Sequence, residues 1–391
     1  KDCQSDCGME IALWVQPNVV VTRPVSSVQE SVTSFDPQGI KFYTDRETRY
    51  ALRGLTQFLD EPGEFLPIQD GLVLAIPRGT GSCCAIATGS GGILIRNASW
   101  ITISNLDFEQ MADAGKFGKG IAIFANSPGI AGLTIIGNRF RNFDLRAGTG
   151  VINLRGVSDL VIANNQIDTV VRGSGIRLAG PSQRTRIEGN RIERIGRTAI
   201  YVSDASDVEV TENYIGDIKG VHGNGLTAYL GNQRVTFRRN TVIDAKQPAT
   251  FHGNGEESLT PQFITFEENL LITTPDSLGS LISWGRTTRN VIIRDNILLG
   301  GRFGLRMNVT DQNVLIERNL GMPPAPTARV IEPMNSRANR WLLSRPGWEI
   351  DLERHARGQT PLSPVQQVKV CKSMFGEAAK GRAAGANFVC P

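Results

Sequence analysis

A short pattern recurs nine times through the middle of the chain, and it constrains the fold more than any other feature. Each copy alternates apolar with polar residues and ends on Asn, and successive copies are 23 to 33 residues apart. Alternation with a period of two indicates a strand with one buried face. The copies are WITISN, LTIIGN, LVIANN, TRIEGN, VEVTEN, VTFRRN, ITFEEN, VIIRDN and VLIERN, which end at Asn105, Asn138, Asn165, Asn190, Asn213, Asn240, Asn269, Asn296 and Asn319.

Two further short strands accompany most copies. One follows the Asn, as in RIERI and YIGDI, and one precedes the copy, as in GIRLAG and AIYVSD. The regular Leu spacing and helical stretch of a leucine-rich repeat are missing. Three strands per repeat describe one coil of a parallel β-helix, whose coils stack about 4.8 Å apart around a shared core. The sequence therefore predicts an all-β solenoid of about nine to eleven coils.

The recurring Asn has a physical reason to be there. Asn turns the chain readily and tolerates a left-handed backbone. Stacked Asn side chains can also hydrogen-bond along the axis and satisfy buried amides. We therefore expect an Asn ladder at one corner of the coils.

On this repeat, residues 86–325 resemble the right-handed parallel β-helix, or pectin-lyase-like, superfamily. The segments FLDEPGEF (58–65) and DGLVLAIPRG (70–79) look like the entry segment of secreted carbohydrate-active β-helix proteins. Members of the superfamily are mostly polysaccharide lyases, glycoside hydrolases and uronan epimerases, with some noncatalytic tail proteins. The resemblance implies a right-handed solenoid that binds or acts on a polysaccharide.

The repeat also predicts the domain organisation. Residues 1–85 are expected to form an N-terminal cap and entry segment, 86–325 the β-helix, and 326–391 a C-terminal cap. Caps are needed because a solenoid exposes its core at both ends. We expect a short N-terminal helix within 27–35 or 43–58, and a C-terminal helix over 365–380.

Six Cys residues lie outside the central repeats. They suit terminal disulfides in an oxidising compartment, whereas a zinc site would need a second close Cys or His pair. Fifteen pairings exist for six Cys, and Cys371 with Cys390 is the simplest one. The start at Lys1 rather than Met fits a processed N-terminus. We therefore expect a secreted or periplasmic protein. The residues are Cys3, Cys7, Cys83, Cys84, Cys371 and Cys390.

Charge and hydropathy exclude several classes of partner. The formal net charge is +4, and no dense basic tract indicates nucleic-acid binding. No apolar run is long enough to span a membrane. No dense acidic cluster predicts a metal site, so no metal ligand is assigned, no cofactor is required and calcium stays open.

Outward side chains of one strand in each coil should stack into a ladder, because side chains in a strand alternate between faces. With the apolar residues of the strand before each copy assigned to the core, a row of mostly aromatic and basic residues faces outward. Asn153 or Arg155 would join this row one coil earlier. The outward residues are Arg177, Tyr201, Thr227, Tyr229, Arg306 and Asn308.

The sequence His-Gly-Asn-Gly occurs at 222–225 and again at 252–255. His222 lies 18 residues before Asn240, and His252 lies 17 before Asn269, which predicts nearly the same place on neighbouring coils. Two plain turns are the alternative, since Asn-Gly is a common turn. His252 either faces outward in a strand over 250–253 or precedes the strand, with Glu256 in the outward place.

These residues predict a site for an acidic polysaccharide. Arg and Lys favour carboxylated sugars. A cation would neutralise the C5 carboxylate, His would remove the C5 proton, and Tyr or Lys would protonate the leaving oxygen. Reprotonation from the other side would give C5 epimerisation. The expected catalytic residues are His222, His252, Tyr201, Lys219 and Arg177, and the expected substrate-binding residues are Asn224, Tyr229, Asn254, Glu256, Trp284, Arg286 and Arg306.

Two other function classes stay open. Glycoside hydrolysis needs two carboxyl groups about 5–5.5 Å or about 6.5–9.5 Å apart, and Asp204, Asp217, Glu256 and Glu257 are the candidates. A noncatalytic glycan-binding β-helix would keep the groove without a convergent acid–base set. The basic ladder and paired histidines favour β-elimination or C5-epimerisation on a uronate-containing polymer.

Overall fold

The computed structural model forms two compact units, Lys1–Ile86 and Ala87–Pro391. The structure describes residues 8–16, 19–29, 32–42, 48–55, 65–68, 71–74, 91–112, 120–146, 148–220, 222–325, 338–342, 348–359, 361–375, 380–383, 385 and 388–391. Cys3, Cys7, Cys83, Cys84 and residues 58–64 of the FLDEPGEF segment lie outside these ranges.

The first unit contains an antiparallel sheet in the order β3-β2-β1-β4 and a separate hairpin of β5 and β6. Met9, Ile11, Leu13, Val15 and Val25 form its core. The strands are β1 (Glu10–Gln16), β2 (Val19–Gln29), β3 (Val32–Phe35), β4 (Arg49–Arg53), β5 (Phe65–Ile68) and β6 (Gly71–Leu74).

The expected N-terminal helix is wrong where the structure describes the chain. Most of 27–35 belongs to β2 and β3, and 49–53 forms β4. In the first segment Val28, Val32 and Thr33 are β-branched and favour a pleated strand over a helix. The second segment, RYALR, forms a strand because it pairs with β1. The role of residues 1–85 as a cap stays a prediction.

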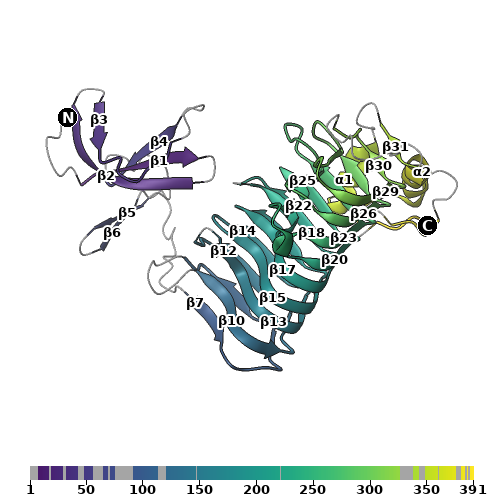
Figure 1. The fold of residues 1–391 in the computed structure, drawn as a ribbon, viewed down its shortest axis with the longest axis horizontal. Coiled ribbons are helices and arrows are strands. Elements are labelled where there is room, and N and C mark those ends of the chain that lie inside the picture. The colour runs from purple at the N-terminus through teal and green to yellow at the C-terminus, as the bar shows by residue number, and fades with distance from the viewer. Residues whose placement is uncertain are drawn as a thin grey trace. The chain divides into compact units, whose positions relative to one another are not determined.

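The second unit is a parallel β-helix, as predicted, with strands stacked from coil to coil (Figure 1). It completes about eight turns, slightly fewer than the nine to eleven coils expected, although incomplete coils bring one sheet to ten strands. Each complete coil has three sides, which we call faces A, B and C. The strands β10 (Ile121–Ala131), β13 (Gly150–Ala163), β15 (Ser174–Glu188) and β17 (Thr198–Thr211) bend around the corner between faces A and B.

The remaining strands each belong to one face. Face A adds β7 (Gly91–Ile95), β19 (Asn224–Ala228), β22 (Gln247–Gly253), β25 (Leu281–Gly285) and β28 (Leu305–Arg306). Face B adds β8 (Thr102–Ser104), β11 (Thr134–Ile136), β20 (Gln233–Arg238), β23 (Gln262–Glu267), β26 (Arg289–Arg294) and β29 (Gln312–Glu317). Face C consists of β9 (Asp107–Glu109), β12 (Arg139–Phe143), β14 (Gln166–Val170), β16 (Arg191–Ile195), β18 (Tyr214–Ile218), β21 (Thr241–Ala245), β24 (Leu270–Thr273), β27 (Ile297–Leu299), β30 (Leu320–Gly321) and β31 (Arg340–Trp341).

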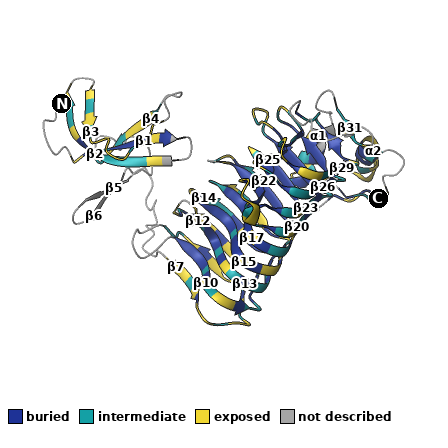
Figure 2. Cartoon of the chain, in the orientation of Figure 1, coloured by how far each residue is buried: buried dark blue, intermediate teal, exposed yellow. Residues whose placement is uncertain are grey.

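Buried residues follow one another from coil to coil (Figure 2). Their inward side chains form one continuous core. The predicted Asn ladder is present at the corner between faces B and C. Asn190 illustrates it: its Nδ2 donates to Asn213 Oδ1 and to the carbonyl of Ile162, both at 2.9 Å. The residue before the Asn, such as Glu212 with φ +56°, takes the left-handed conformation. Asn105 does not join the ladder. Ile136 pairs with Ser104, which sets Asn105 opposite Gly137 rather than opposite the ladder residue Asn138.

Two helices, α1 (Trp348–Ala356) and α2 (Pro364–Phe375), follow the coils. The predicted helix over 365–380 is confirmed as α2, which ends at Phe375. The predicted Cys371–Cys390 disulfide is also confirmed. Trp341 packs against the end of the main core. The helices instead cover the outer side of face C, in a second cluster of Tyr214, Ile243, Leu270, Ile272, Ile297, Leu299, Leu320, Leu352, Ala356, Leu362, Val370, Cys371, Met374, Phe388 and Cys390.

Candidate functional site

Face A carries a row of outward residues in strand register. Asn153 pairs with Arg177, Arg177 with Tyr201, Tyr201 with Thr227, and Thr227 with Thr250. The residues on either side of each are buried in the core. The predicted alignment is therefore confirmed for Asn153, Arg177, Tyr201 and Thr227, although Thr227 is buried. The catalytic and binding roles of these residues stay predictions.

A second row lies two residues further along the same strands. His252 pairs with Trp284, and the pairing of Ala228 with Phe251 sets Tyr229 beside His252. The ring centroids of Tyr201 and Tyr229 are 5.6 Å apart, and those of Tyr229 and His252 are 5.2 Å apart. The two rows thus bring two phenols and an imidazole together on one surface.

The two His-Gly-Asn-Gly motifs are not structurally equivalent, contrary to the expectation. His252 lies within β22 and occupies the outward place that one interpretation gave it. His222 precedes β19 and has φ +70°. His222 and His252 are almost equally far from the next Asn of the repeat, at 18 and 17 residues. This agreement is a coincidence, because the two coils carry their extra residues at different corners. In the later coil they follow β22, in a loop that contains the 3-10 helix η2 (Glu257–Leu259).

Burial sets the protonation of both histidines. Burial, followed by the nearby charge of His222, lowers the pKa of His252 to about 4. Burial, followed by the charge of Arg197, lowers the pKa of His222. Nε2 of His252 is buried and has no hydrogen-bond partner among the described residues. His252 is therefore a neutral imidazole at neutral pH, and its Nε2 meets no hydrogen-bonding group among the described residues.

Two arginines lie beside the aromatic residues. The Arg177 guanidinium carbon is 4.8 Å from the Tyr201 ring centroid. Arg197 acts on Tyr201, Tyr229 and His222, and burial lowers its pKa. Burial raises the pKa of Tyr201, while Arg177 and Arg197 oppose that shift. We call these six residues the face A cluster: Arg177, Arg197, Tyr201, His222, Tyr229 and His252.

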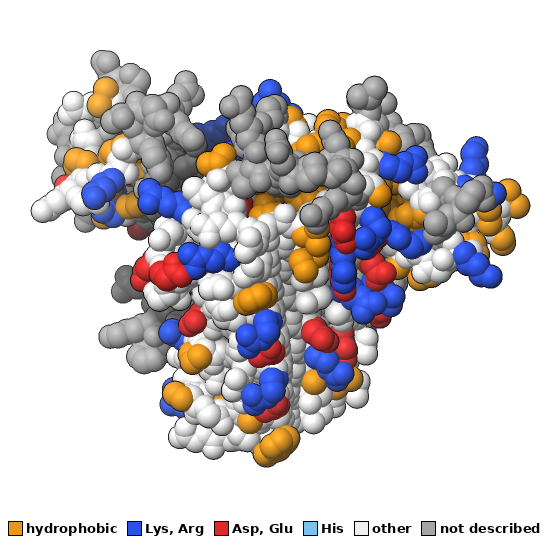
Figure 3. All heavy atoms as spheres, turned by 45° about the vertical axis from the view of Figure 1, so that its right-hand side comes forward, with side chains coloured by type: hydrophobic (Ala, Val, Ile, Leu, Met, Phe, Trp, Pro, Cys, Tyr) orange, Lys and Arg blue, Asp and Glu red, His pale blue; other side chains and the backbone are white. Residues whose placement is uncertain are grey.

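Sequence reasoning missed Arg197. It stands just before the strand Thr198–Thr211, so its outward place is not set by the alternation that located Tyr201. Arg177 and Arg197 form no ion pair within the described parts of the chain. By contrast, Arg184 binds Asp159 and Arg234 binds Asp207, with Nε–Oδ1 distances of 2.6 Å. Acidic and basic side chains lie in such pairs in Figure 3. The charge of the face A cluster is thus left for a ligand.

Other predicted site residues lie around this cluster or away from it. Lys219 is held in ion pairs with Asp217 and Asp244. Asn254 and Glu256 are exposed and bond to each other in a turn, where the Asn254 Oδ1 accepts from the Glu256 amide at 2.9 Å. The exposed Arg286 lies against Gly255, where an added Cβ would be 2.9 Å from its Cδ.

Asn224, Trp284 and Arg306 also lie on face A. The Asn224 amide donates to the Thr227 hydroxyl at 3.2 Å, and its Oδ1 is buried without a described partner. The Trp284 indole donates to Gln247 Oε1 at 2.9 Å. The Arg306 guanidinium carbon is 4.8 Å from the Trp284 ring centroid. A second cation–aromatic pair therefore lies beyond His252, in the direction of higher coils.

No two of the four acids considered for hydrolysis contact each other through their side chains in the described residues, although Asp217 lies against a fifth carboxylate, Asp244. Asp217 is 3.6 Å from Lys219 and from Arg357. Glu257 binds Arg289, and Glu256 accepts from Ser258 at 3.2 Å. Asp204 is exposed near the face A cluster and has no ion pair among the described residues. No group of three or more His, Cys, Asp or Glu side chains suited to a metal occurs in the described ranges.

Residues 79–242 match the family model described as right handed beta helix region. Comparisons with curated proteins and with solved structures gave no match. Together with the stacked parallel sheets, the match supports a right-handed parallel β-helix fold. The fold is consistent with a carbohydrate-active enzyme or a carbohydrate-binding protein. No helix in the described ranges is long and apolar enough to cross a membrane.

Proposed function

We propose that this protein acts on a uronate-containing polysaccharide by removing the proton at C5, with β-elimination as the outcome. One observation carries the proposal: a buried neutral His252 lies among tyrosines and arginines that have no carboxylate partner in the described chain. A glycoside hydrolase would require a carboxylate pair, and the candidate acids are bound elsewhere or isolated.

The residues divide the work as follows. Arg177 and Arg197 bind the C5 carboxylate and stabilise the charge that develops on it. The neutral imidazole of His252 takes the C5 proton, and the electron pair of that bond moves toward the carboxylate. The C4–O bond then breaks to give a C4–C5 double bond. The departing oxygen takes the proton of Tyr201, whose raised pKa keeps it protonated.

The placement of the groups favours elimination over epimerisation. Tyr201, Tyr229 and His252 project from one surface of one sheet, so they would meet a sugar from one side. Epimerisation needs a proton donor on the opposite side of the C5 atom. His222, which precedes β19, is the candidate for that role. The disulfide supports a secreted or periplasmic location, because such bonds persist in oxidising compartments.

A panel of uronans tests the proposal. We expect ultraviolet absorbance from an unsaturated uronate to rise together with new reducing ends. New reducing ends without that absorbance would contradict β-elimination and favour hydrolysis. Exchange of the C5 proton in heavy water without cleavage would instead identify an epimerase. Glycan binding with none of these signals would leave a noncatalytic binding protein.

A further inference from the structure

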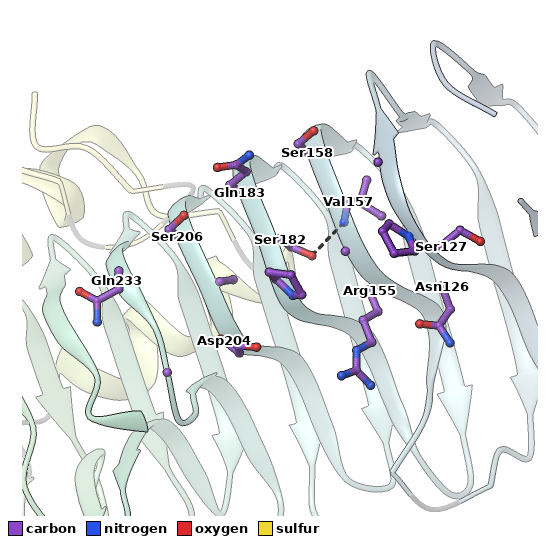
Figure 4. Close-up of a pocket in the computed structure, with 16 residues that line it drawn as sticks. Asn126, Ser127, Arg155, Val157, Ser158, Ser182, Gln183, Asp204, Ser206 and Gln233 are labelled. Carbon is purple, nitrogen blue, oxygen red and sulfur yellow. Dashed lines mark hydrogen bonds between the residues drawn. The ribbon is translucent and has the colours of Figure 1, made fainter. Parts of the chain in front are cut away.

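A hollow of about 470 Å³ crosses the corner between faces A and B, and polar side chains form part of its lining (Figure 4). It is lined by β10, β13, β15, β17 and β20 and by the turns within or beside them, so it extends over five successive coils. It adjoins the face A cluster, since Asp204 lies three residues after Tyr201 and Gly231 two residues after Tyr229. We call this hollow the corner groove.

One wall of the corner groove is a row of polar residues in strand register. Ser158 pairs with Gln183, Gln183 with Ser206, and Ser206 with Gln233. Figure 4 shows these four along one side of the groove. The row alternates a short hydroxyl with a long amide, and neither amide has a hydrogen-bond partner among the described residues. One amide is therefore available to a ligand on every second coil, first that of Gln183 and then that of Gln233.

The floor is fixed by internal hydrogen bonds. The buried Ser182 hydroxyl donates to the Ala179 carbonyl at 2.6 Å and accepts from the Val157 amide at 3.2 Å. Arg155 Nε donates to the Gly180 carbonyl at 3.1 Å. Because these groups are already bonded, the groove is preformed, and a ligand would not have to order it.

The opposite side of the groove holds one cation and one anion. Asp204 lies between two glycines: an added Cβ on Gly180 would be 2.4 Å from its carboxyl carbon, and one on Gly231 would be 3.1 Å from Oδ1. Its carboxylate has no partner among the described residues. With Arg155 opposite in charge, the lining is balanced, unlike the face A cluster with its two unpaired arginines. Such a lining suits hydroxyl groups rather than carboxylates.

We infer that the corner groove binds the glycan beyond the uronate that is bound at the face A cluster, with the amides of Gln183 and Gln233 on the neutral sugars of successive disaccharide units. Coils repeat about every 4.8 Å, so the Ser–Gln alternation repeats about every 9.6 Å, a length similar to a disaccharide in an extended glycan. The substrate is then a heteropolymer in which uronate alternates with a neutral sugar. This inference rests on the proposed function for its ligand class.

Calorimetry tests this inference by measuring how tightly the protein binds oligosaccharides of increasing length, from disaccharide to octasaccharide. One series comes from alternating uronate–hexose polymers and the other from pure polyuronates. The variant is Gln183→Ala with Gln233→Ala. The control is Gln262→Ala, which pairs with Gln233 in the same row but lies outside the groove. In the double variant we expect the alternating octasaccharide to bind about tenfold more weakly and the disaccharide unchanged. The control should match wild type.

Three results would overturn the inference: equal affinities of the double variant and wild type at every length, wild-type affinity that does not rise with length, or equal sensitivity with pure polyuronates. The calorimetry compares all proteins in a His252→Gln background, which prevents turnover, and loss of the C5 proton is measured separately with an intact His252, so the two proposals fail separately. Tight, length-dependent binding without any loss of the C5 proton would contradict the proposed function and leave the corner groove supported.

Discussion

The imidazole of His252 and the phenol ring of Tyr229 lie on neighbouring strands with their centroids 5.2 Å apart. This contact, together with burial, keeps the His252 ring away from water. The chemistry of the proposed site depends on that environment, because a base must be neutral to accept a proton.

The first prediction concerns the pH dependence of catalysis. Since the pKa of His252 is lowered to about 4, kcat/KM should stay high below pH 6.5 and fall only near pH 4. A pH–rate profile measures this directly, because kcat/KM reports the free enzyme. An acidic limb centred near the ordinary histidine pKa would contradict the buried position of the base.

The same lowered pKa predicts a change in stability. In the unfolded chain His252 takes up a proton near pH 6.5, whereas in the folded protein it does so only near pH 4. The free energy of unfolding should therefore decrease as the pH falls from about 6.5 to about 4. Chemical denaturation of wild type and His252→Gln should show a weaker decrease in the variant. Parallel curves would argue that His252 is hydrated in the folded protein.

The third prediction assigns the proton donor. Tyr201→Phe keeps the ring beside Arg177 but removes the hydroxyl, so kcat should fall by about 10²–10⁴-fold with little change in KM. Tyr229→Phe is the matched control, with a smaller expected effect. If Tyr229→Phe is the more damaging change, the donor is Tyr229 and the assignment to Tyr201 is wrong.

The fourth prediction concerns the unpaired arginines. Arg177→Ala and Arg197→Ala should each lower kcat/KM by about 10²–10³-fold, because each removes charge that stabilises the developing anion. Arg186→Ala is the control, since Arg186 lies in the same strand as Arg177 but 3.8 Å from Glu188 on face B. A loss of similar size in the control would point to a general structural effect.

The fifth prediction tests the Asn ladder. Asn213 is fully buried and donates to the Ile187 carbonyl at 2.9 Å and to Asn240 Oδ1 at 3.0 Å. Asn213→Ala should lower the free energy of unfolding by about 2–4 kcal/mol, since it leaves buried polar groups without partners. The exposed Asn126→Ala should change it by less than about 0.5 kcal/mol. Thermal or urea unfolding of both variants gives the comparison.

The fold was predictable from sequence because its main determinant is local and repeated. Nine alternating copies define a buried face, and a one-residue slip would expose it. That same logic located Arg177, Tyr201 and Tyr229. It failed for the equivalence of His222 and His252, because spacing to the next Asn does not reveal the corner at which extra residues are inserted.

Other features depend on packing that no local pattern encodes. Arg197 stands outside the strand alternation. Lys219 was expected beside the histidines, but Asp217 and Asp244 hold it in ion pairs. The C-terminal helices were expected at an end, whereas they also cover the outer apolar residues of face C, such as Ile243 and Leu299. Those outward apolar residues were the signal that could have predicted a covering layer.

The most direct measurement of the central claim is the release of label from a uronan deuterated at C5. Elimination and epimerisation both move that hydrogen to solvent, while hydrolysis leaves it in place. We predict that wild type releases the label and that His252→Gln does so at least about 100-fold more slowly. Cleavage of the polymer with the label fully retained, or equal release by the variant, would contradict the account.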